Sequence, residues 1–160
     1  MDRKIIIGID PGVNGGIAYY MPINREVYAI SMPDKIEDFD KCFSHVLSNS
    51  IVYIEDVPPF VGVNRPAARI FKLAKNYGII LGVLTALEIE YKLVRPMVWM
   101  KAIGAGKRKD FENDNKWKNH LKKLATDYFP NSRPTLKTAD ALLILEYGLQ
   151  QYFSKDCKDV

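Results

Sequence analysis

Three acidic residues stand in apolar surroundings that are unfavourable for a charge, and carboxylates placed in this way can hold a metal ion. Asp10 and Glu55 each end a short apolar run, and Asp140 lies inside the apolar stretch Ala139–Leu145. A carboxylate in such surroundings costs free energy unless its charge is compensated, and Asp is also a poor residue inside a helix. Simpler interpretations remain open: Asp10 and Glu55 could face solvent at strand ends, and Asp140 could lie on the polar face of an amphipathic helix.

The chemistry that such a set could support is the binding of a hard divalent cation. Oxygen ligands in basic surroundings favour Mg²⁺, or Mn²⁺, over zinc. The two histidines, His45 and His120, are too few and too far apart in sequence for a zinc site, and we expect both at the surface. Mg²⁺ held by a few carboxylates completes its shell with phosphate and water, an arrangement suited to phosphodiester chemistry.

Short apolar runs and turn residues predict the elements that would position these acids. Five strands are expected, the second and third in an antiparallel meander, over residues 4–10, 17–20, 26–30, 51–55 and 91–94. Helices are expected over 34–47 with Asp34 as cap, over 64–87, from Pro96, over 115–129, and from Thr135 to Tyr152. This order predicts an α/β fold in which helices flank a mixed five-stranded sheet.

Length and composition exclude several classes of protein. The chain has 160 residues, of which 48% are hydrophobic, which suits one folded domain and excludes general disorder. Two cysteines exclude a disulfide scaffold and favour a reducing compartment. No apolar run approaches the roughly 20 residues that cross a bilayer, and the first residues do not resemble a signal peptide. We therefore expect a cytoplasmic protein with no membrane partner, a single domain over 1–153, and a frayed tail over 154–160.

Charge is distributed unevenly along the chain. Residues 1–60 carry five basic and nine acidic side chains, whereas residues 61–137 carry sixteen basic and six acidic ones. Such a block is the electrostatic footprint expected for a polyanion partner. The alternative is a solvated, lysine-rich helix face with no binding role.

Several ordered motifs resemble one nuclease family. The segment 6–12, Ile-Ile-Gly-Ile-Asp-Pro-Gly, resembles the opening of the RuvC-type Holliday-junction resolvases, which belong to the RNase H-like superfamily. Residues 53–57 resemble their second motif, and residues 139–142 resemble their last. Arg65, Leu73, Gly78 and Gly82 resemble the long dimer helix of that family. The resemblance covers residues 4–150, and the length and lysine-rich third quarter resemble the phage-encoded branch, which would act in a bacterial host cytoplasm.

The resemblance implies a fold, a reaction and a set of ligands. It implies an RNase H-like domain in which Asp10, Glu55 and Asp140 bind two divalent metal ions per subunit, Mg²⁺ with Mn²⁺ as a substitute. It further implies a homodimer that resolves four-way DNA junctions. Each subunit would nick one strand symmetrically, leaving 5′-phosphate and 3′-hydroxyl ends.

The resemblance also assigns roles to basic and aromatic residues. Lys101 and Lys118 align best with the catalytic basic positions, with Lys107 and Lys116 as close rivals because the loop length there is uncertain. Phe60 would be the aromatic residue that packs against junction bases. Further DNA contacts would come from Arg65, Lys107, Arg108, Lys109, Lys116 and Lys122.

One position departs from the family pattern and keeps other functions open. The cellular resolvases carry a fourth acid one helical turn before the last Asp, and this chain has Lys137 there. The second metal could then be held weakly, or Lys137 could stand in electrostatically. Two alternatives follow: a broader nuclease for branched DNA or RNA, and a junction-binding protein without activity. An actin-like sugar kinase or ATPase is disfavoured by the short chain and the lack of a P-loop.

Overall fold

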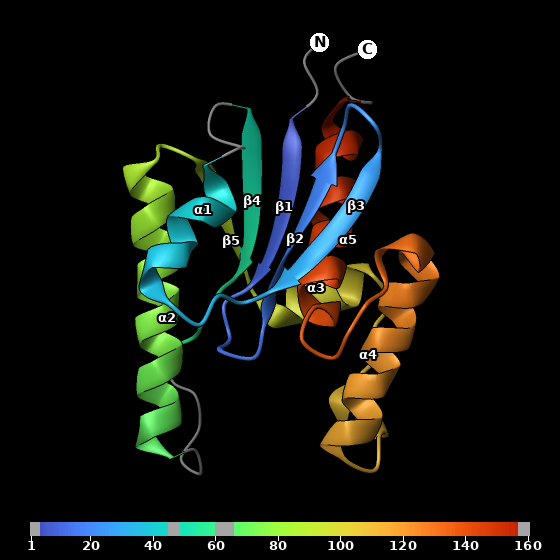
Figure 1. The fold of residues 1–160 in the computed structure, drawn as a ribbon. Coiled ribbons are helices and arrows are strands. Elements are labelled where there is room, and N and C mark those ends of the chain that lie inside the picture. Colours follow the sequence, from blue (N-terminus) through green and yellow to red (C-terminus); the bar gives the residue numbers. More distant parts are fainter. Residues whose placement is uncertain (1–3, 45–48, 60–65, 157–160) are drawn as a thin grey trace.

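The computed structural model describes residues 4–44, 49–59 and 66–156, and its centre is one five-stranded mixed sheet (Figure 1). The strand order is β3-β2-β1-β4-β5. Antiparallel pairing joins β1 (Ile5–Asp10) to β2 (Gly16–Met21) and β2 to β3 (Glu26–Ser31). On its other side β1 pairs in parallel with β4 (Ser50–Glu55), which pairs in parallel with β5 (Glu90–Val94). The mixed sheet predicted from the sequence is confirmed.

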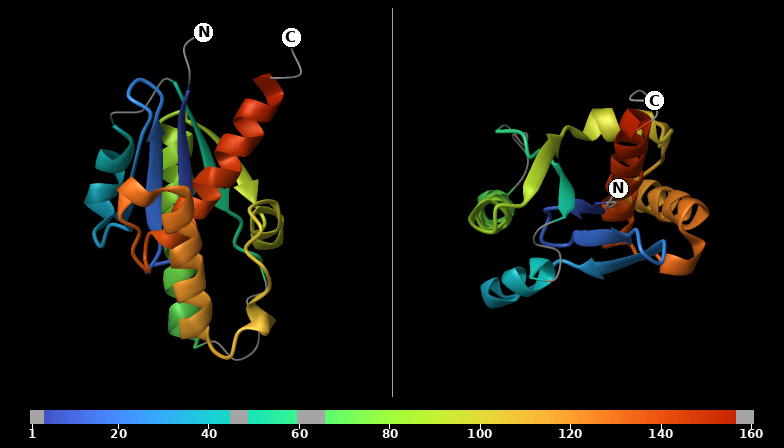
Figure 2. Two further views of the ribbon diagram at one scale, coloured as in Figure 1. Left: turned by 90° about the vertical axis from the view of Figure 1, so that its right-hand side faces the viewer. Right: turned by 90° about the horizontal axis from the view of Figure 1, so that it is seen from above.

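Helices cover both faces of the sheet (Figure 2). One apolar core lies under α1 (Phe39–Phe43) and α2 (Ala67–Ala86). The other lies under α5 (Ala139–Asp156), with α3 (Pro96–Ala102) and α4 (Asp114–Tyr128) packed beside it. Single 3₁₀ turns occur at Ile36–Asp38, Arg108–Asp110 and Pro130–Ser132. No helix in the described ranges is long and apolar enough to span a membrane.

A glycine in the central strand lets α5 lie directly on the sheet. A Cβ atom at Gly8 would lie 2.7 Å from the Cα of Leu145, and nearer still to the Leu145 nitrogen and the Ala141 oxygen. Real Cβ atoms do not come so close to backbone, so only glycine fits between β1 and α5. This close approach brings the first turn of α5 beside the carboxyl end of β1.

Two predicted helix ends were wrong. The helix expected over 34–47 is, among the described residues, one 3₁₀ turn followed by the short α1, because only Phe39 and Phe43 anchor it in the core. Asp34 is therefore not its cap. The last helix continues to Asp156 instead of ending near Tyr152. Phe153 makes an edge-to-face contact with Tyr20 of the sheet, which supports the extra turn.

The other helices begin close to their predicted starts. Pro96 opens α3, and the Asn113 side chain caps α4 by accepting a hydrogen bond from the Lys116 N–H at 2.9 Å. The Thr135 hydroxyl accepts from the Thr138 N–H at 3.2 Å ahead of α5. Short polar side chains therefore accept hydrogen bonds from free backbone N–H groups at these helix starts, at or near the positions predicted from the sequence.

Candidate metal and nucleic-acid site

The fold places Asp10 and Glu55 at the same end and on the same face of the sheet. Ile9 of β1 pairs in parallel register with Ile54 of β4, so the residues that follow them are neighbours. Side chains alternate between the two faces along a strand, and Ile6 of β1 and Tyr53 of β4 pack in the core under α5. Asp10 lies four residues after Ile6 and Glu55 two residues after Tyr53, so both acids lie on the α5 face. Both side chains are partly buried.

Asp140 joins them from the first turn of α5. Its charge and that of Asp10 both raise the pKa of Glu55, and Asp10 raises the pKa of Asp140. The three carboxylates are therefore electrostatic neighbours. The amino end of a helix favours negative charge, which partly offsets this repulsion for Asp140.

A glycine-rich turn holds the Asp10 carboxylate. The Gly12 N–H donates to its Oδ1 at 2.9 Å. A Cβ atom at Gly15 would lie 2.7 Å from Oδ2, so a larger residue there would displace the carboxylate. Asn76 of α2 donates to the Pro11 carbonyl at 2.7 Å and ties the turn to that helix. The turn thus fixes the position of the Asp10 side chain.

The indole of Trp99 holds Glu55 in the same way. Trp99 is fully buried, and its Nε1–H donates to Glu55 Oε2 at 2.9 Å. This hydrogen-bond partner of Glu55 was not predicted from the sequence. The only indication that the sequence could offer is a general one: the N–H of a buried indole usually has a hydrogen-bond acceptor.

Burial sets the protonation of the three acids. Desolvation raises the pKa of Glu55 to about 8 and that of Asp140 to about 7, and repulsion from Asp10 adds to both. Desolvation also raises the pKa of Asp10, against the hydrogen bond from Gly12 and the charge of Lys118. The chain's own cations therefore do not compensate these charges fully. A bound cation would stabilise such a site most at a pH where the carboxylates are ionised.

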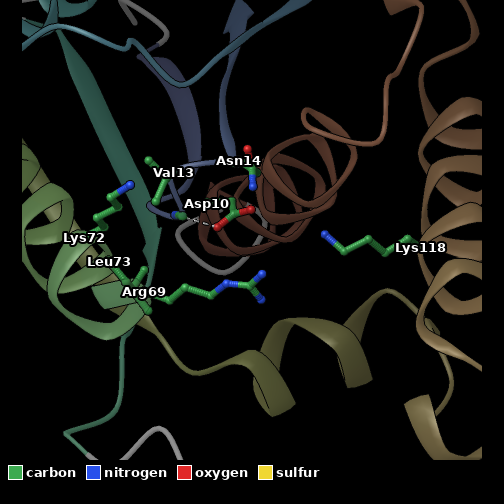
Figure 3. Close-up of a pocket in the computed structure, with 9 residues that line it drawn as sticks. Asp10, Val13, Asn14, Arg69, Lys72, Leu73 and Lys118 are labelled. Carbon is green, nitrogen blue, oxygen red and sulfur yellow. Dashed lines mark hydrogen bonds between the residues drawn. The ribbon is translucent and has the colours of Figure 1, made fainter. Parts of the chain in front are cut away.

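A pocket of about 660 Å³ opens beside Asp10, between the glycine-rich turn, α2 and α4. Figure 3 shows Lys118 of α4 and Arg69 of α2 pointing into it from opposite sides. Lys118 lowers the pKa values of both Asp10 and Asp140. Lys118 was predicted from the sequence as a basic residue of the site. Arg69 and Lys72 were not, although their i,i+3 spacing places both on one side of a helix.

The other predicted basic residues lie away from the carboxylates or fall outside the described residues. Lys101 and Lys107 line a second pocket of about 630 Å³, beside Met97 and Met100. Arg108 lines it too, and its side chain pairs with Asp114 at 2.6 Å. Lys109 is exposed in the following 3₁₀ turn.

Helix periodicity separates the two lysines proposed along α4. Lys122 lies one turn after Lys118 and shares its side of the helix, whereas Lys116 lies about 160° away. Lys137 is exposed in the turn before α5, and Lys118 is the cation that acts on Asp140. Phe60 and Arg65 fall outside the described residues.

The expectation that His120 lies at the surface was wrong. His120 is partly buried, its Nε2 lies 2.8 Å from the Ala105 carbonyl oxygen, and its ring stacks on Trp117. Trp117 is buried in the same cluster. These contacts attach the loop after α3 to α4, so they are structural. His45 is outside the described residues.

The donor chemistry of the three acids fits Mg²⁺. Asp10 and Glu55 each use one carboxylate oxygen in a hydrogen bond within the described structure, which leaves the other for a ligand. As they stand, no three His, Cys, Asp or Glu side chains among the described residues converge closely enough to hold one ion. Mutual repulsion keeps carboxylates apart when no cation lies between them, so the side chains would have to draw together on binding.

Removing the indole hydrogen bond should change the pH dependence of the site. The bond from Trp99 lowers the pKa of Glu55, so Trp99→Phe should raise that pKa further. The pH midpoint of any activity that needs ionised Glu55 should then rise by up to about one unit. A pH–rate profile of the variant beside wild type tests this, and an unchanged midpoint would show that Glu55 does not control it.

Burial of Glu55 should also make the metal-free protein less stable as pH rises. Because its pKa is raised from 4.5 to about 8 on folding, the folded state binds more protons than the unfolded state between these values. Stability is therefore present below pH 4.5 and is lost as pH rises toward 8. Glu55→Gln should raise stability at pH 8.5 by about 2 kcal/mol, or about 5 °C in Tm, with little gain at pH 4.5. Thermal unfolding in EDTA measures this, and equal gains at both pH values would contradict it.

Comparison with known proteins adds evidence about the fold alone. No family model and no curated protein matches the sequence. Among solved structures, RuvC from Thermus thermophilus superposes with a TM-score of 0.58 at 16% identity, covering 94% of this chain and 96% of that one. This chain has the RNase H-like fold. The T. thermophilus RuvC solved in complex with Holliday junction substrate superposes with a TM-score of 0.57 at 13% identity, with 96% of each chain covered.

A third solved structure, the yeast mitochondrial Holliday junction resolvase Ydc2, matches with a lower score. It has a TM-score of 0.38 at 10% identity and covers 97% of this chain and 84% of that one. The fold class predicted from the sequence is confirmed. At these identities the chemistry must be argued from the residues of this chain.

Proposed function

We propose that this chain is a divalent-metal-dependent endonuclease that resolves four-way DNA junctions. The observation that carries the proposal is that Asp10, Glu55 and Asp140 are electrostatic neighbours at one end of an RNase H-like sheet, with Lys118 acting on Asp10 and Asp140. The T. thermophilus RuvC of similar fold was solved on a junction, which supports this substrate class. The products would be paired symmetric nicks with 5′-phosphate and 3′-hydroxyl ends.

The three carboxylates would hold the cation, Mg²⁺ or Mn²⁺, with two ions per subunit as the proposed number. A bound divalent ion of this kind supplies Lewis acidity and lowers the pKa of a bound water. The chain's own part is to fix the ligands: the Gly12 N–H orients Asp10, and Trp99 orients Glu55. Lys118 would offset negative charge that develops on the phosphate.

The basic residues that the resemblance assigns to DNA divide by position. Lys118 and Lys122 would face the strand being cut. Lys101, Lys107 and Arg108 surround the second pocket, with Lys109 close by in sequence, and would contact DNA outside the carboxylate site. Phe60 and Arg65 remain candidates for contacts at the branch point. Placement in the phage-encoded branch, and with it a bacterial host cytoplasm, stays a prediction.

The outer face of α2 is the proposed dimer interface. Phe71 is 69% exposed there, and a Cβ at Gly78 or Gly82 would meet nothing within 4 Å among the described residues. These positions share one side of the helix, which leaves an apolar stripe with room for a second helix. A two-fold dimer would match the two-fold symmetry of a four-way junction.

An arginine in this stripe should break the dimer. Gly82→Arg would place a charge where the two helices meet, which is costly without a partner. Sedimentation velocity should show a monomer for this variant and a dimer for wild type and for Ile23→Arg, whose position is 96% exposed in a turn. A Gly82→Arg protein that stays dimeric would place the interface elsewhere.

A substrate panel distinguishes the proposal from its alternatives. A labelled four-way junction, a Y-fork, a linear duplex and an RNA hairpin are compared in Mg²⁺ and in Mn²⁺. The proposal expects cleavage of the junction at least about tenfold faster than of the other substrates. Equal cutting of forks would indicate a debranching nuclease, and preferred cutting of the hairpin an RNA-processing one. Binding with no cutting in either metal would indicate a junction-binding protein.

A further inference from the structure

The pocket beside Asp10 has two cationic walls, and the proposed chemistry uses only one of them. Lys118 of α4 acts on the carboxylates, whereas Arg69 and Lys72 line the opposite side, on α2. The pocket of about 660 Å³ exceeds what a single phosphate group needs, since one liquid water takes about 30 Å³. The space can therefore hold more of a DNA strand than the phosphate being cut.

The side chain of Arg69 has no partner among the residues that the structure describes. Its side chain is exposed and makes no ion pair or hydrogen bond with other described residues. The cation that lowers the pKa values of Asp10 and Asp140 is Lys118, so Arg69 is not a counter-ion of the carboxylates. It also lies about 160° around α2 from Phe71, away from the proposed dimer face. An arginine held in a pocket without an internal partner is available to a ligand.

The chemistry of the pocket points to a phosphodiester as that ligand. A guanidinium presents a planar set of donors that matches two phosphate oxygens. Lys72 adds a second positive charge one helical turn along, and Asn14 of the glycine-rich turn adds an amide to the same lining. Asp10 on the pocket floor would repel an anion set directly against it, so the bound phosphate must lie toward α2.

We propose that Arg69, with Lys72, binds the DNA phosphate adjacent to the scissile one and so fixes the register of the strand over the carboxylates. The proposal rests on the nuclease function proposed above and adds a phosphate subsite to it. Arg69 acts here as a positioning residue, because its partner is not the phosphate that reacts. Two cationic walls would hold consecutive phosphates, one on each side of the acids.

The first test measures binding without cleavage. Junction affinity is measured against salt concentration in EDTA for wild type, Arg69→Ala, Arg69→Lys and Arg25→Ala. Arg25 is an exposed arginine in the turn between β2 and β3, at the opposite end of the sheet from Asp10. Losing one phosphate contact should reduce the slope of log K against log salt by about 1. We expect that reduction for Arg69→Ala, little change for Arg69→Lys, and none for Arg25→Ala.

The second test locates the phosphate. Junctions carrying one neutral methylphosphonate, walked through three positions on each side of the cut, are cleaved by wild type and by Arg69→Ala. At the adjacent position the neutral linkage should slow wild type about tenfold and leave Arg69→Ala unchanged, since the variant has already lost that contact. Arg69→Lys should keep the salt slope yet cut more slowly, because lysine lacks the bidentate geometry.

The outcomes separate this proposal from the function beneath it. If wild type cleaves junctions and Arg69→Ala keeps the full salt slope, the subsite is wrong and the nuclease function stands. If wild type cuts no substrate but Arg69→Ala still loses one phosphate contact, the nuclease function is wrong and Arg69 is a DNA contact only. A methylphosphonate effect equal in wild type and Arg69→Ala at every position also overturns the subsite.

Discussion

Replacing Asp10 by Asn is expected to abolish cleavage of a four-way junction and leave binding intact. The rate should fall at least about a thousandfold, equivalent to about 4 kcal/mol of transition-state stabilisation. Asp10 raises the pKa values of both other acids, and its Oδ2 accepts no hydrogen bond within the described structure. Asn keeps the size and one oxygen but not the charge that a divalent ion needs.

Binding of the same variant should be unchanged or tighter, because a negative charge beside the DNA is removed. Single-turnover cleavage and gel-shift affinity measure the two effects separately. Asp140→Asn should behave alike, since Asp140 lies beside the same partners. A variant that lost binding and folding together would show that Asp10 is a structural residue, and the metal-site assignment would then be wrong.

Replacing Lys118 by Ala should have the second largest effect, a loss in rate of about 10²-fold to 10³-fold. Lys118 reaches the pocket beside Asp10 and lowers the pKa values of Asp10 and Asp140. Its removal should therefore slow the chemical step and also move the pH midpoint of cleavage upward. Cleavage rates at saturating enzyme measure both effects when they are taken across pH 6–9, a range of about three units that surrounds the pKa values of the site.

The control lies on the same helix. Lys123 pairs with Asp127 at 2.9 Å on another side of α4, and Lys123→Ala should cut within about threefold of wild type. Lys101 gives the sharper contrast, because the resemblance ranks it with Lys118 while the fold places it in a different pocket. If Lys101→Ala cost more activity than Lys118→Ala, the arrangement proposed here would be contradicted.

Strand positions were predictable from the sequence because one short pattern encodes both the element and its acid. An apolar run that ends in a carboxylate, followed by proline and glycine, fixes where β1 ends and leaves Asp10 at the end of the strand. The same reasoning applies to Glu55. Two such strands in parallel register bring their last residues together, which local pattern and general sheet geometry suffice to predict.

Contacts between distant elements could not be predicted in this way. The hydrogen bond from Trp99 to Glu55 joins residues 44 positions apart, and the pocket side of Arg69 depends on how α2 lies against the turn. Apolar periodicity predicted α2 well, because it indicates which residues pack in the core. It does not indicate which exposed cation of the helix faces another element of the fold. The length of α1 was overestimated because only Phe39 and Phe43 are anchored in the core there.

The most direct test of the account uses a plasmid that extrudes a cruciform, incubated with wild type and with Asp10→Asn in Mg²⁺ and in Mn²⁺. A dimer that cuts two opposed strands within one bound complex gives linear plasmid with ligatable ends, and nicked circles should not accumulate. We predict that product for wild type alone. Wild-type protein that binds the cruciform but leaves it uncut in both metals would contradict the proposed nuclease function, because three intact carboxylates would then perform no metal-dependent chemistry.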